Sequence, residues 1–307
     1  MLNKIGTYLL AFAVILLFAG PAIAAISGRP NIGIVKSRDN ASYSMVEKGF
    51  RYLVSETHPG TNYEVYVLDN SSDLENIAGR KFDIILTIGR EAAVRVSERI
   101  DDIPVIVTAV LNPGKNLADR KNVSIFSLDI PPKKQLSIMQ ETLPARKRVG
   151  IIYDPDQNEA YVKSAKTAAT ELGITLKAFP VSSAREVPKV RAMDVEVLWI
   201  IPDTTVCQIA IIRRLLIDSL KNNVAAMAFS PSYVKAGALL GITHNYSELG
   251  ENSGRLALEM LRKEGLLSAG VIYSHCALIY LNEAVAKTMR ITIPRKITEK
   301  AQQVFGR

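Results

Sequence analysis

The residues best suited to chemistry in this sequence follow short apolar segments, at the points where those segments end. Most of them carry a hydroxyl, carboxylate or guanidinium group, one is a glycine, and Val110 and Tyr153 are the last residues of their segments. The full set is Ser37, Gly89, Arg90, Glu91, Val110, Tyr153, Asp154, Asp203, Thr204, Thr205 and Ser230. Several of them begin an expected helix, and the free backbone N–H groups of a helix start favour a carboxylate or another anion. Three of them, Asp154, Asp203 and Ser230, are equally suited to act only as helix N-caps. Anion binding and helix capping therefore both stay open for these positions.

Strands and helices alternate along the chain, and this alternation positions the polar residues. Short apolar runs, most of them containing β-branched residues, predict strands at residues 31–35, 63–68, 82–88, 104–110, 148–153, 175–179, 197–201, 225–229 and 238–243. Helical periodicity predicts helices at residues 42–56, 133–142, 159–172 and 247–263. Continuous β-branched runs are typical of strands buried on both faces of a parallel sheet, and the intervening helices supply its right-handed crossovers. The sequence thus predicts an α/β fold.

The alternation restarts near the middle of the chain, which predicts two lobes. The strand at residues 148–153 resembles the first strand, and we place the boundary at residues 143–147. The first lobe is expected over residues 25–143 and the second over residues 146–243. Ligands of open α/β sheets sit beyond the carboxyl ends of the strands. If two such edges face each other, a small molecule can be trapped between them while the two lobes hinge shut.

The N-terminus has the pattern of a cleaved signal peptide at residues 1–24. Lys4 precedes an unbroken apolar run of twelve residues, and Ala22 and Ala24 place small side chains at the cleavage site. An uncleaved membrane anchor is the alternative, but twelve residues span only about 18 Å of helix against about 30 Å of hydrocarbon. We therefore expect a periplasmic protein without stable membrane insertion after cleavage.

The charge pattern argues against nucleic-acid binding. The net charge is +8, but basic residues mostly occur singly among acidic ones, and the densest run is Arg146, Lys147 and Arg148. No nucleic-acid recognition motif accompanies this run, which fits a solvated loop. The sequence also lacks metal-ligand spacing and phosphate-loop motifs, so we expect no cofactor and no metal.

A two-lobed racemase-like enzyme is the catalytic alternative, because such folds use one cysteine from each lobe. Cys207 is expected inside a helix, and Cys276 lies in an apolar run. A nucleophile needs an adjacent base, whereas His275 and Cys276 would point to opposite faces of a strand. We therefore expect that this chain is not an enzyme. Two small buried side chains are the favoured interpretation of the cysteines, and a disulfide stays open.

Six motifs occur in an order that resembles a known family. They are IGREAA, VTAVLNPG, RVGIIYDP, IIPDTTV, KAGALLGITHNYSELGENSG and LNEAVAKTMRITIP. In these motifs the chain resembles the ABC transporter substrate-binding family typified by tryptophan and tyrosine receptors. The resemblance runs from Phe82 to the C-terminus, while residues 40–80 depart from the family pattern.

The resemblance implies a type I periplasmic-binding-protein-like fold, with two Rossmann-like lobes, parallel sheets and a hinge of three crossings. It implies that residues 244–279 return to the first lobe and that the last helices, over residues 280–307, pack on the second. It also implies a function as the exported receptor of an ABC importer, which binds a small-molecule ligand and partners a permease with its ATPase. A periplasmic sensor that partners a signalling or outer-membrane receptor is the alternative.

The resemblance implies ligand contacts at residues 89–91 and 202–205. For an amino-acid ligand, Thr204, Thr205 and Ser230 are candidates for the carboxylate, and Glu91 and Asp203 for the ammonium group. A flat ligand side chain needs aromatic walls, and the candidates for them are Tyr43, Tyr153 and Tyr233. Packing within the lobes is an equal alternative role for these tyrosines. With Ser37, Gly89, Arg90, Val110 and Asp154, these residues complete the expected site.

Overall fold

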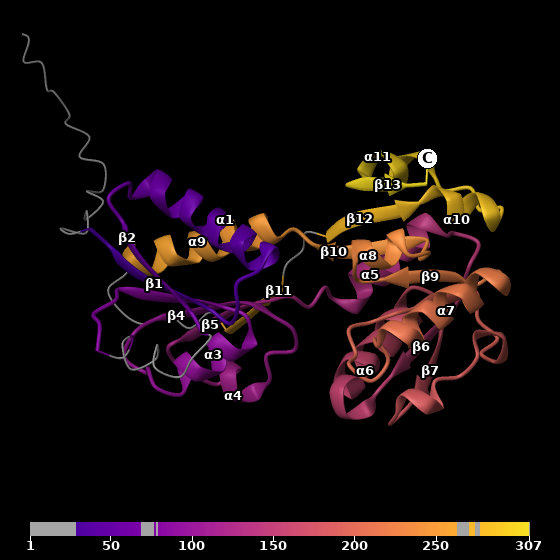
Figure 1. Ribbon diagram of the computed structural model, residues 1–307, viewed down its shortest axis with the longest axis horizontal. Coiled ribbons are helices and arrows are strands. Elements are labelled where there is room, and N and C mark those ends of the chain that lie inside the picture. Colours follow the sequence, from indigo (N-terminus) through magenta and orange to yellow (C-terminus); the bar gives the residue numbers. More distant parts are fainter. Residues whose placement is uncertain (1–28, 69–76, 78, 263–269, 274–276, 307) are drawn as a thin grey trace, which may run out of the picture.

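The computed structural model describes residues 29–68, 77, 79–262, 270–273 and 277–306, arranged as two lobes side by side (Figure 1). Each lobe is built on its own sheet. The expected signal peptide at residues 1–24 lies outside the described residues. Over the described part of the chain, no helix combines the length and the apolar composition needed to cross a bilayer.

The first sheet is parallel throughout, in the order β11-β5-β4-β3-β1-β2. Its strands are β1 (Asn31–Lys36), β2 (Asn62–Val67), β3 (Ile84–Ile88), β4 (Val105–Val110), β5 (Val123–Ser127) and β11 (Gly270–Tyr273). Helices α1 (Ala41–Thr57) and α9 (Tyr246–Arg262) cover one face. Helices α3 (Arg90–Ser97) and α4 (Lys115–Ala118) cover the other. Strands β1, β3 and β4 therefore end at one edge of this lobe, which is where sequence analysis placed the polar residues.

The second sheet has the order β13-β12-β10-β9-β8-β6-β7, and all its pairings are parallel except β10 with β12. Its strands are β6 (Arg148–Tyr153), β7 (Thr175–Pro180), β8 (Val197–Trp199), β9 (Ala225–Ala228), β10 (Leu240–His244), β12 (Ala277–Asn282) and β13 (Gln303–Phe305). One face packs against α5 (Pro132–Thr142), α6 (Pro155–Glu171), α10 (Glu283–Thr288) and α11 (Arg295–Lys300). The other packs against α7 (Ile209–Lys221), α8 (Pro231–Lys235) and the 3-10 turns Ala184–Glu186 and Val190–Ala192. Two parallel-dominated sheets with interleaved helices confirm the predicted α/β class.

Local sequence signals explain where α6 begins and ends. The Asp154 side chain accepts a hydrogen bond from the backbone N–H of Asp156, which caps the first turn, and Pro155 occupies the first helical position. At the other end Gly173 adopts a φ of +65°, and the N–H of Ile174 bonds to the carbonyl of Ala169. This helix therefore presents its first turns to the carboxyl edge of the second sheet.

Helix α9 joins the first lobe, although β10 before it belongs to the second sheet. It runs along α1, and glycines let the two backbones approach. A Cβ atom at Gly250 would collide with the carbonyl oxygen of Val46, and one at Gly49 would collide with that of Ser247. Strand β11 follows in the first sheet and β12 in the second. The return to the first lobe, expected over residues 244–279, therefore ends before Ala277, where the second-lobe strand β12 begins.

The expected lobe boundary at residues 143–147 is wrong, because it assigns α5 to the first lobe. Leu136, Met139 and Leu143 pack in the second-lobe core with Ile151 and Val162. The chain therefore changes lobe after β5, at residues 128–131. The error has a physical source, because β5 reads VSIFS and its serines interrupt the apolar pattern that predicts a buried strand.

Candidate functional site

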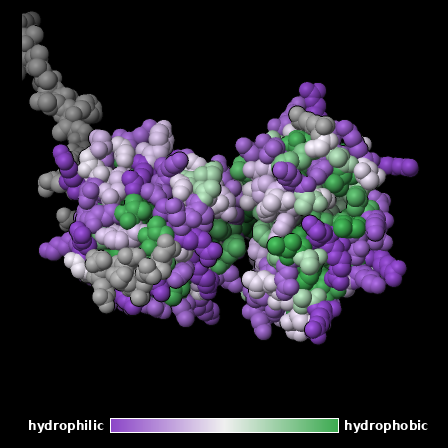
Figure 2. All heavy atoms as spheres, in the orientation of Figure 1, coloured by the Kyte–Doolittle hydropathy of each residue, from purple (hydrophilic) through white to green (hydrophobic). Residues whose placement is uncertain are grey.

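A cavity of about 940 Å³ lies between the two lobes and is lined from both sides. Figure 2 shows the corresponding hollow between two rounded bodies. The first lobe contributes residues from the ends of β4 and β5 and from α3, and the second contributes residues from α6, β9, β10 and the loop after β8. The polar and aromatic members are Arg90, Asn112, Asp129, Gln135, Asp156, Gln157, Asn158, Tyr161, Asp203, Thr204, Cys207, Phe229, Thr243, His244 and Tyr246. This placement is the one expected of a ligand site in facing α/β lobes.

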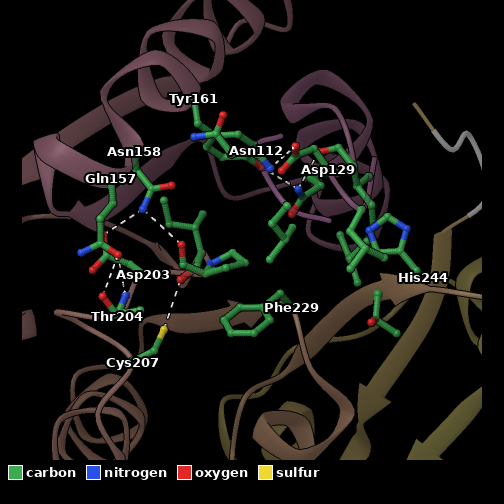
Figure 3. A pocket seen from close by; sticks show the side chains of 18 of the residues that line it. Asn112, Asp129, Gln157, Asn158, Tyr161, Asp203, Thr204, Cys207, Phe229 and His244 are labelled. Atoms are coloured by element: carbon green, nitrogen blue, oxygen red, sulfur yellow. Dashed lines mark hydrogen bonds between the residues drawn. The ribbon is translucent and has the colours of Figure 1, made fainter. Parts of the chain in front are cut away.

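Asp203 lies in the cavity wall (Figure 3), but its carboxylate is fully engaged by hydrogen bonds within the second lobe. Oδ2 accepts from the backbone N–H of Asp154 at 2.7 Å and from the side chain of Asn158 at 2.9 Å. Oδ1 accepts from the N–H groups of Thr205 and Val206, both at 3.0 Å. A carboxylate offers about four acceptor positions, so none is left for a ligand ammonium group. These four hydrogen bonds give Asp203 a structural role, which is to hold the loop after β8 against the start of α6.

The neighbouring hydroxyl and amide groups belong to the same network. The hydroxyl of Thr205 donates to Asp154 at 2.6 Å, and this bond is the main reason that the pKa of Asp154 is lowered. The side chain of Gln157 donates to Asp154 at 3.0 Å and accepts from the N–H and hydroxyl of Thr204 at 3.0 and 2.8 Å. Of the predicted residues here, only Asp203 and Thr204 line the cavity, while Thr205 and Asp154 lie behind them.

Asp129 is a cavity residue that sequence analysis missed. It follows β5 at the first lobe crossing, and its Oδ2 accepts from the N–H of Asn112 at 2.8 Å and from the hydroxyl of Ser127 at 2.7 Å. Within the described residues, nothing hydrogen-bonds to Oδ1 of Asp129. A carboxylate that is fixed through one oxygen and open at the other is suited to hold a cationic group.

The aromatic walls come from residues other than those expected. Tyr161 on α6 lines the cavity and contacts Trp199 edge-on, with 6.0 Å between the ring centroids. Its hydroxyl oxygen accepts a hydrogen bond from the side chain of Gln135 at 2.6 Å. Burial raises the pKa of the Tyr161 hydroxyl far above its usual value. Phe229, directly after β9, forms another wall and packs edge-on against Tyr233, with 5.3 Å between the ring centroids. The helical position of Tyr161 was visible in the sequence, but not which helix face meets the cavity.

Four of the predicted residues gather at a second cavity of about 490 Å³ on the first lobe: Ser37, Tyr43, Arg90 and Glu91. Its other lining residues are Arg38, Val94 and Arg95, and only Arg90 lines both cavities. One Arg90 nitrogen donates to the carbonyl oxygens of Asn112 and Leu111 at 2.9 and 3.3 Å, which fixes the guanidinium between the two spaces.

The remaining predicted contacts lie outside the lining of both cavities. Val110 is buried in the sheet, and Tyr153 is buried with its hydroxyl donating to Glu159 at 2.9 Å. Ser230 caps α8 by accepting from the N–H of Ser232. Gly89 adopts a φ of +96° beneath the second cavity. For Asp154 and Ser230, capping is therefore the role that the geometry supports.

Cys207 lies before α7 rather than inside a helix, because α7 begins only at Ile209. It carries a free thiol that donates to the carbonyl of Ile201 at 3.2 Å, and burial raises the pKa of that thiol. A raised pKa keeps the sulfur protonated, which is unfavourable for a nucleophile. Cys276 and His275 lie outside the described residues. In the described part of the chain, no group of three or more His, Cys, Asp or Glu residues is arranged to hold a metal ion.

His244 ends β10 at the second lobe crossing and lines the central cavity. Its Nδ1 is buried without a hydrogen-bond partner among the described residues. Burial lowers the pKa of its imidazole, although a bond to the carbonyl of Leu128 and the charge of Asp129 act in the opposite direction. The neutral imidazole is thus the form that this hinge favours.

The sequence and the fold both resemble known solute receptors. Residues 67–305 match the family described as "ABC transporter substrate binding protein". The tyrosine-binding protein of Clostridioides difficile (strain R20291) is 25% identical over 284 residues, which cover 84% of this chain and 80% of that protein. This family match points to a binding protein rather than an enzyme.

Two solved structures share the fold. A ligand-free, open substrate-binding protein with adhesive properties from Clostridium difficile superposes with a TM-score of 0.77, at 22% identity over 91% of this chain and all of the other. An ABC domain in complex with L-Trp from Streptococcus pneumonia superposes with a TM-score of 0.64, at 20% identity over the same shares. These likenesses confirm the type I periplasmic-binding-protein-like architecture. By its family match over most of its length, the chain belongs to the ABC transporter substrate-binding proteins.

Proposed function

We propose that this chain is an exported, periplasmic receptor that captures an amino-acid-type ligand between its lobes and delivers it to an ABC permease with its ATPase. The central cavity carries the proposal, because both lobes line it and the chain crosses between them beside it. Export is supported by the signal-peptide pattern of residues 1–24. The tyrosine and L-Trp named for two relatives support an amino-acid ligand.

The cavity has groups suited to each part of an amino acid. The open oxygen of Asp129 suits the ammonium group, and the side-chain amide of Asn112 and the guanidinium of Arg90 suit the carboxylate. Tyr161 and Phe229 form walls for a flat side chain. In this assignment Asp129 replaces Asp203, whose oxygens are already occupied.

We infer that the described structure represents the open form of the receptor. Across the central cavity, no hydrogen bond or ion pair joins described residues of the two lobes, and the contacts near it, such as Asn112 with Asp129, lie at the crossings. A ligand that touches both walls would stabilise a closed form, because it binds that form better than the open one.

The test is calorimetry and small-angle scattering on the mature chain with a panel of amino acids that includes L-tyrosine and L-tryptophan. We expect one or more to bind, to reduce the radius of gyration and, at a hundred times its Kd, to add about 2.7 kcal/mol to the free energy of unfolding. Tight binding without compaction would contradict the closure mechanism, and no binding by any amino acid would contradict the ligand class.

A further inference from the structure

The second cavity, on the first lobe, has a charge that the proposed amino-acid site does not need. Its lining residues include three guanidinium groups, those of Arg38, Arg90 and Arg95, and one carboxylate, that of Glu91. Such an excess of positive charge around a concave space favours an anionic ligand group.

The three arginines differ in how far their charges are already compensated. Arg95 pairs with Glu91 at 3.6 Å. Arg90 is held by backbone carbonyl oxygens only, and Arg38 forms no ion pair with a described residue, since the nearby Asp39 pairs with Lys36 at 3.1 Å. At least two guanidinium groups therefore face this space without a carboxylate partner among the described residues.

The floor of the cavity is shaped so that hydroxyl groups reach it. At Gly89, a Cβ atom would lie only 2.5 Å from the hydroxyl oxygen of Tyr43 and 2.7 Å from that of Ser37. Ser37 accepts from the N–H of Ala92 at 2.9 Å, which leaves its own proton available, and the Tyr43 hydroxyl has no partner among the described residues. Both hydroxyls can donate to an anion above Gly89.

We propose that this cavity binds a second anionic group, so that the ligand is an amino acid whose side chain ends in a carboxylate or a similar anion. The inference rests on the proposed function. The ammonium and α-carboxylate groups would occupy the central cavity at Asp129, Asn112 and Arg90. Arg38 and Arg95 are then left for the distal anion, and Arg90 lies between the two groups.

The experiment compares matched acids and amides by calorimetry on the mature chain: L-glutamate with L-glutamine, and 4-carboxy-L-phenylalanine with 4-carbamoyl-L-phenylalanine. In at least one pair, we expect the acid to bind about 10-fold or more tightly than its amide, a preference that added salt reduces. Arg38→Gln and Arg95→Gln should each lower this preference about 5-fold or more. Arg99→Gln is the matched control, because it removes a similar charge from the same lobe outside both cavities and should leave the preference unchanged.

The outcomes separate this inference from the proposed function. If neutral amino acids bind and close the lobes while both acids bind no better than their amides, the second anion site is wrong and the receptor function stands. A preference for the acid that survives both arginine substitutions would also overturn the assignment of this cavity. If no amino acid of either kind binds, both proposals fall.

Discussion

Asp129 and Asp203, two of the aspartates that line the central cavity, come from different parts of the molecule, and their surroundings give them different roles. Asp203, in the second lobe, accepts four hydrogen bonds from its own loop and from α6, which occupy both oxygens. Asp129, at the lobe crossing, accepts two hydrogen bonds on one oxygen and leaves the other open to the cavity. Lining a cavity is therefore a weaker sign of ligand binding than having an unused acceptor there.

The same difference extends to the polar groups of the two lobes. On the second-lobe side, Asp154, Gln157, Thr204 and Thr205 bond to one another. On the first-lobe side, Arg38 has no ion-pair partner among the described residues, and the hydroxyl of Tyr43 has no hydrogen-bond partner among them. The second lobe thus offers the central cavity a preorganised surface, whereas the first lobe carries, at its second cavity, groups that would engage a charged ligand.

The largest effect should come from Asp129→Asn. The side-chain oxygen of an asparagine can keep the two hydrogen bonds from Asn112 and Ser127, while its amide group replaces the negative oxygen. The affinity for an amino acid should fall by about 2 to 5 kcal/mol, the loss typical of removing one partner of a buried charge pair. Calorimetry measures the affinity, and the unfolding midpoint without ligand should stay close to that of the unaltered chain. Unchanged affinity would remove Asp129 from the site.

Asp203→Asn should give the reverse pattern and so sharpens the comparison. Whichever way its amide points, the NH₂ group faces two donors that previously bonded to oxygen. Orphaned buried donors cost about 1 to 3 kcal/mol each, so the free energy of unfolding should fall by about 2 kcal/mol or more in urea denaturation. The outcome that would refute this account is a stable Asp203→Asn protein with greatly weakened ligand binding, which would restore Asp203 as the ammonium partner.

The contrast between the two aspartates also explains what the sequence could predict. Asp203 was found because it follows VLWII, a continuous apolar run that predicts a buried strand. Asp129 was missed because β5 contains two serines, which are buried in this strand and, at Ser127, bonded to Asp129 itself. A strand that buries polar groups in pairs has no apolar periodicity to detect.

Lobe membership was predictable only where it follows local pattern. The alternation of strands and helices indicated two sheets, and the family resemblance implied that the helix at residues 247–263 returns to the first lobe. The assignment of α5 depended instead on side chains distant in sequence, since Leu136 and Met139 pack against β6 and α6. The same holds for Tyr161, because only the packed structure shows which face of α6 meets the cavity.

A third prediction tests the second cavity, on the first lobe, through Gly89→Ala. Gly89 has a φ of +96°, and an added Cβ would crowd the hydroxyls of Tyr43 and Ser37. Backbone strain of this kind costs about 1 to 3 kcal/mol. Gly114→Ala is the matched control, because Gly114 has a φ of +75° but nothing within 4 Å of the added atom. We expect both variants to lose stability in urea denaturation, and only Gly89→Ala to weaken ligand binding. Equal effects on binding would show that the hydroxyls do not matter.

The smallest expected effect concerns His244, which lies beside Asp129 at the hinge. Burial lowers the pKa of His244 below its ordinary value of 6.5. Below about pH 6.5 the unfolded chain binds a proton that the folded hinge does not, so the free energy of unfolding should fall as the pH is lowered. The slope is at most about 1.4 kcal/mol per pH unit for one such group. Above that pH both states are neutral at this position, and His244 should contribute no pH dependence.

The measurement is urea denaturation of the unaltered chain and of His244→Gln between pH 7 and pH 5. The difference in stability between the two proteins should shift in favour of the variant as the pH falls, because glutamine has no proton to gain. The charge of Asp129 opposes this effect by favouring protonated His244. The Asp129→Asn chain should therefore lose stability more steeply with acidification than the unaltered chain. A parallel decline in all three proteins would show that the hinge histidine titrates alike in the folded and unfolded states.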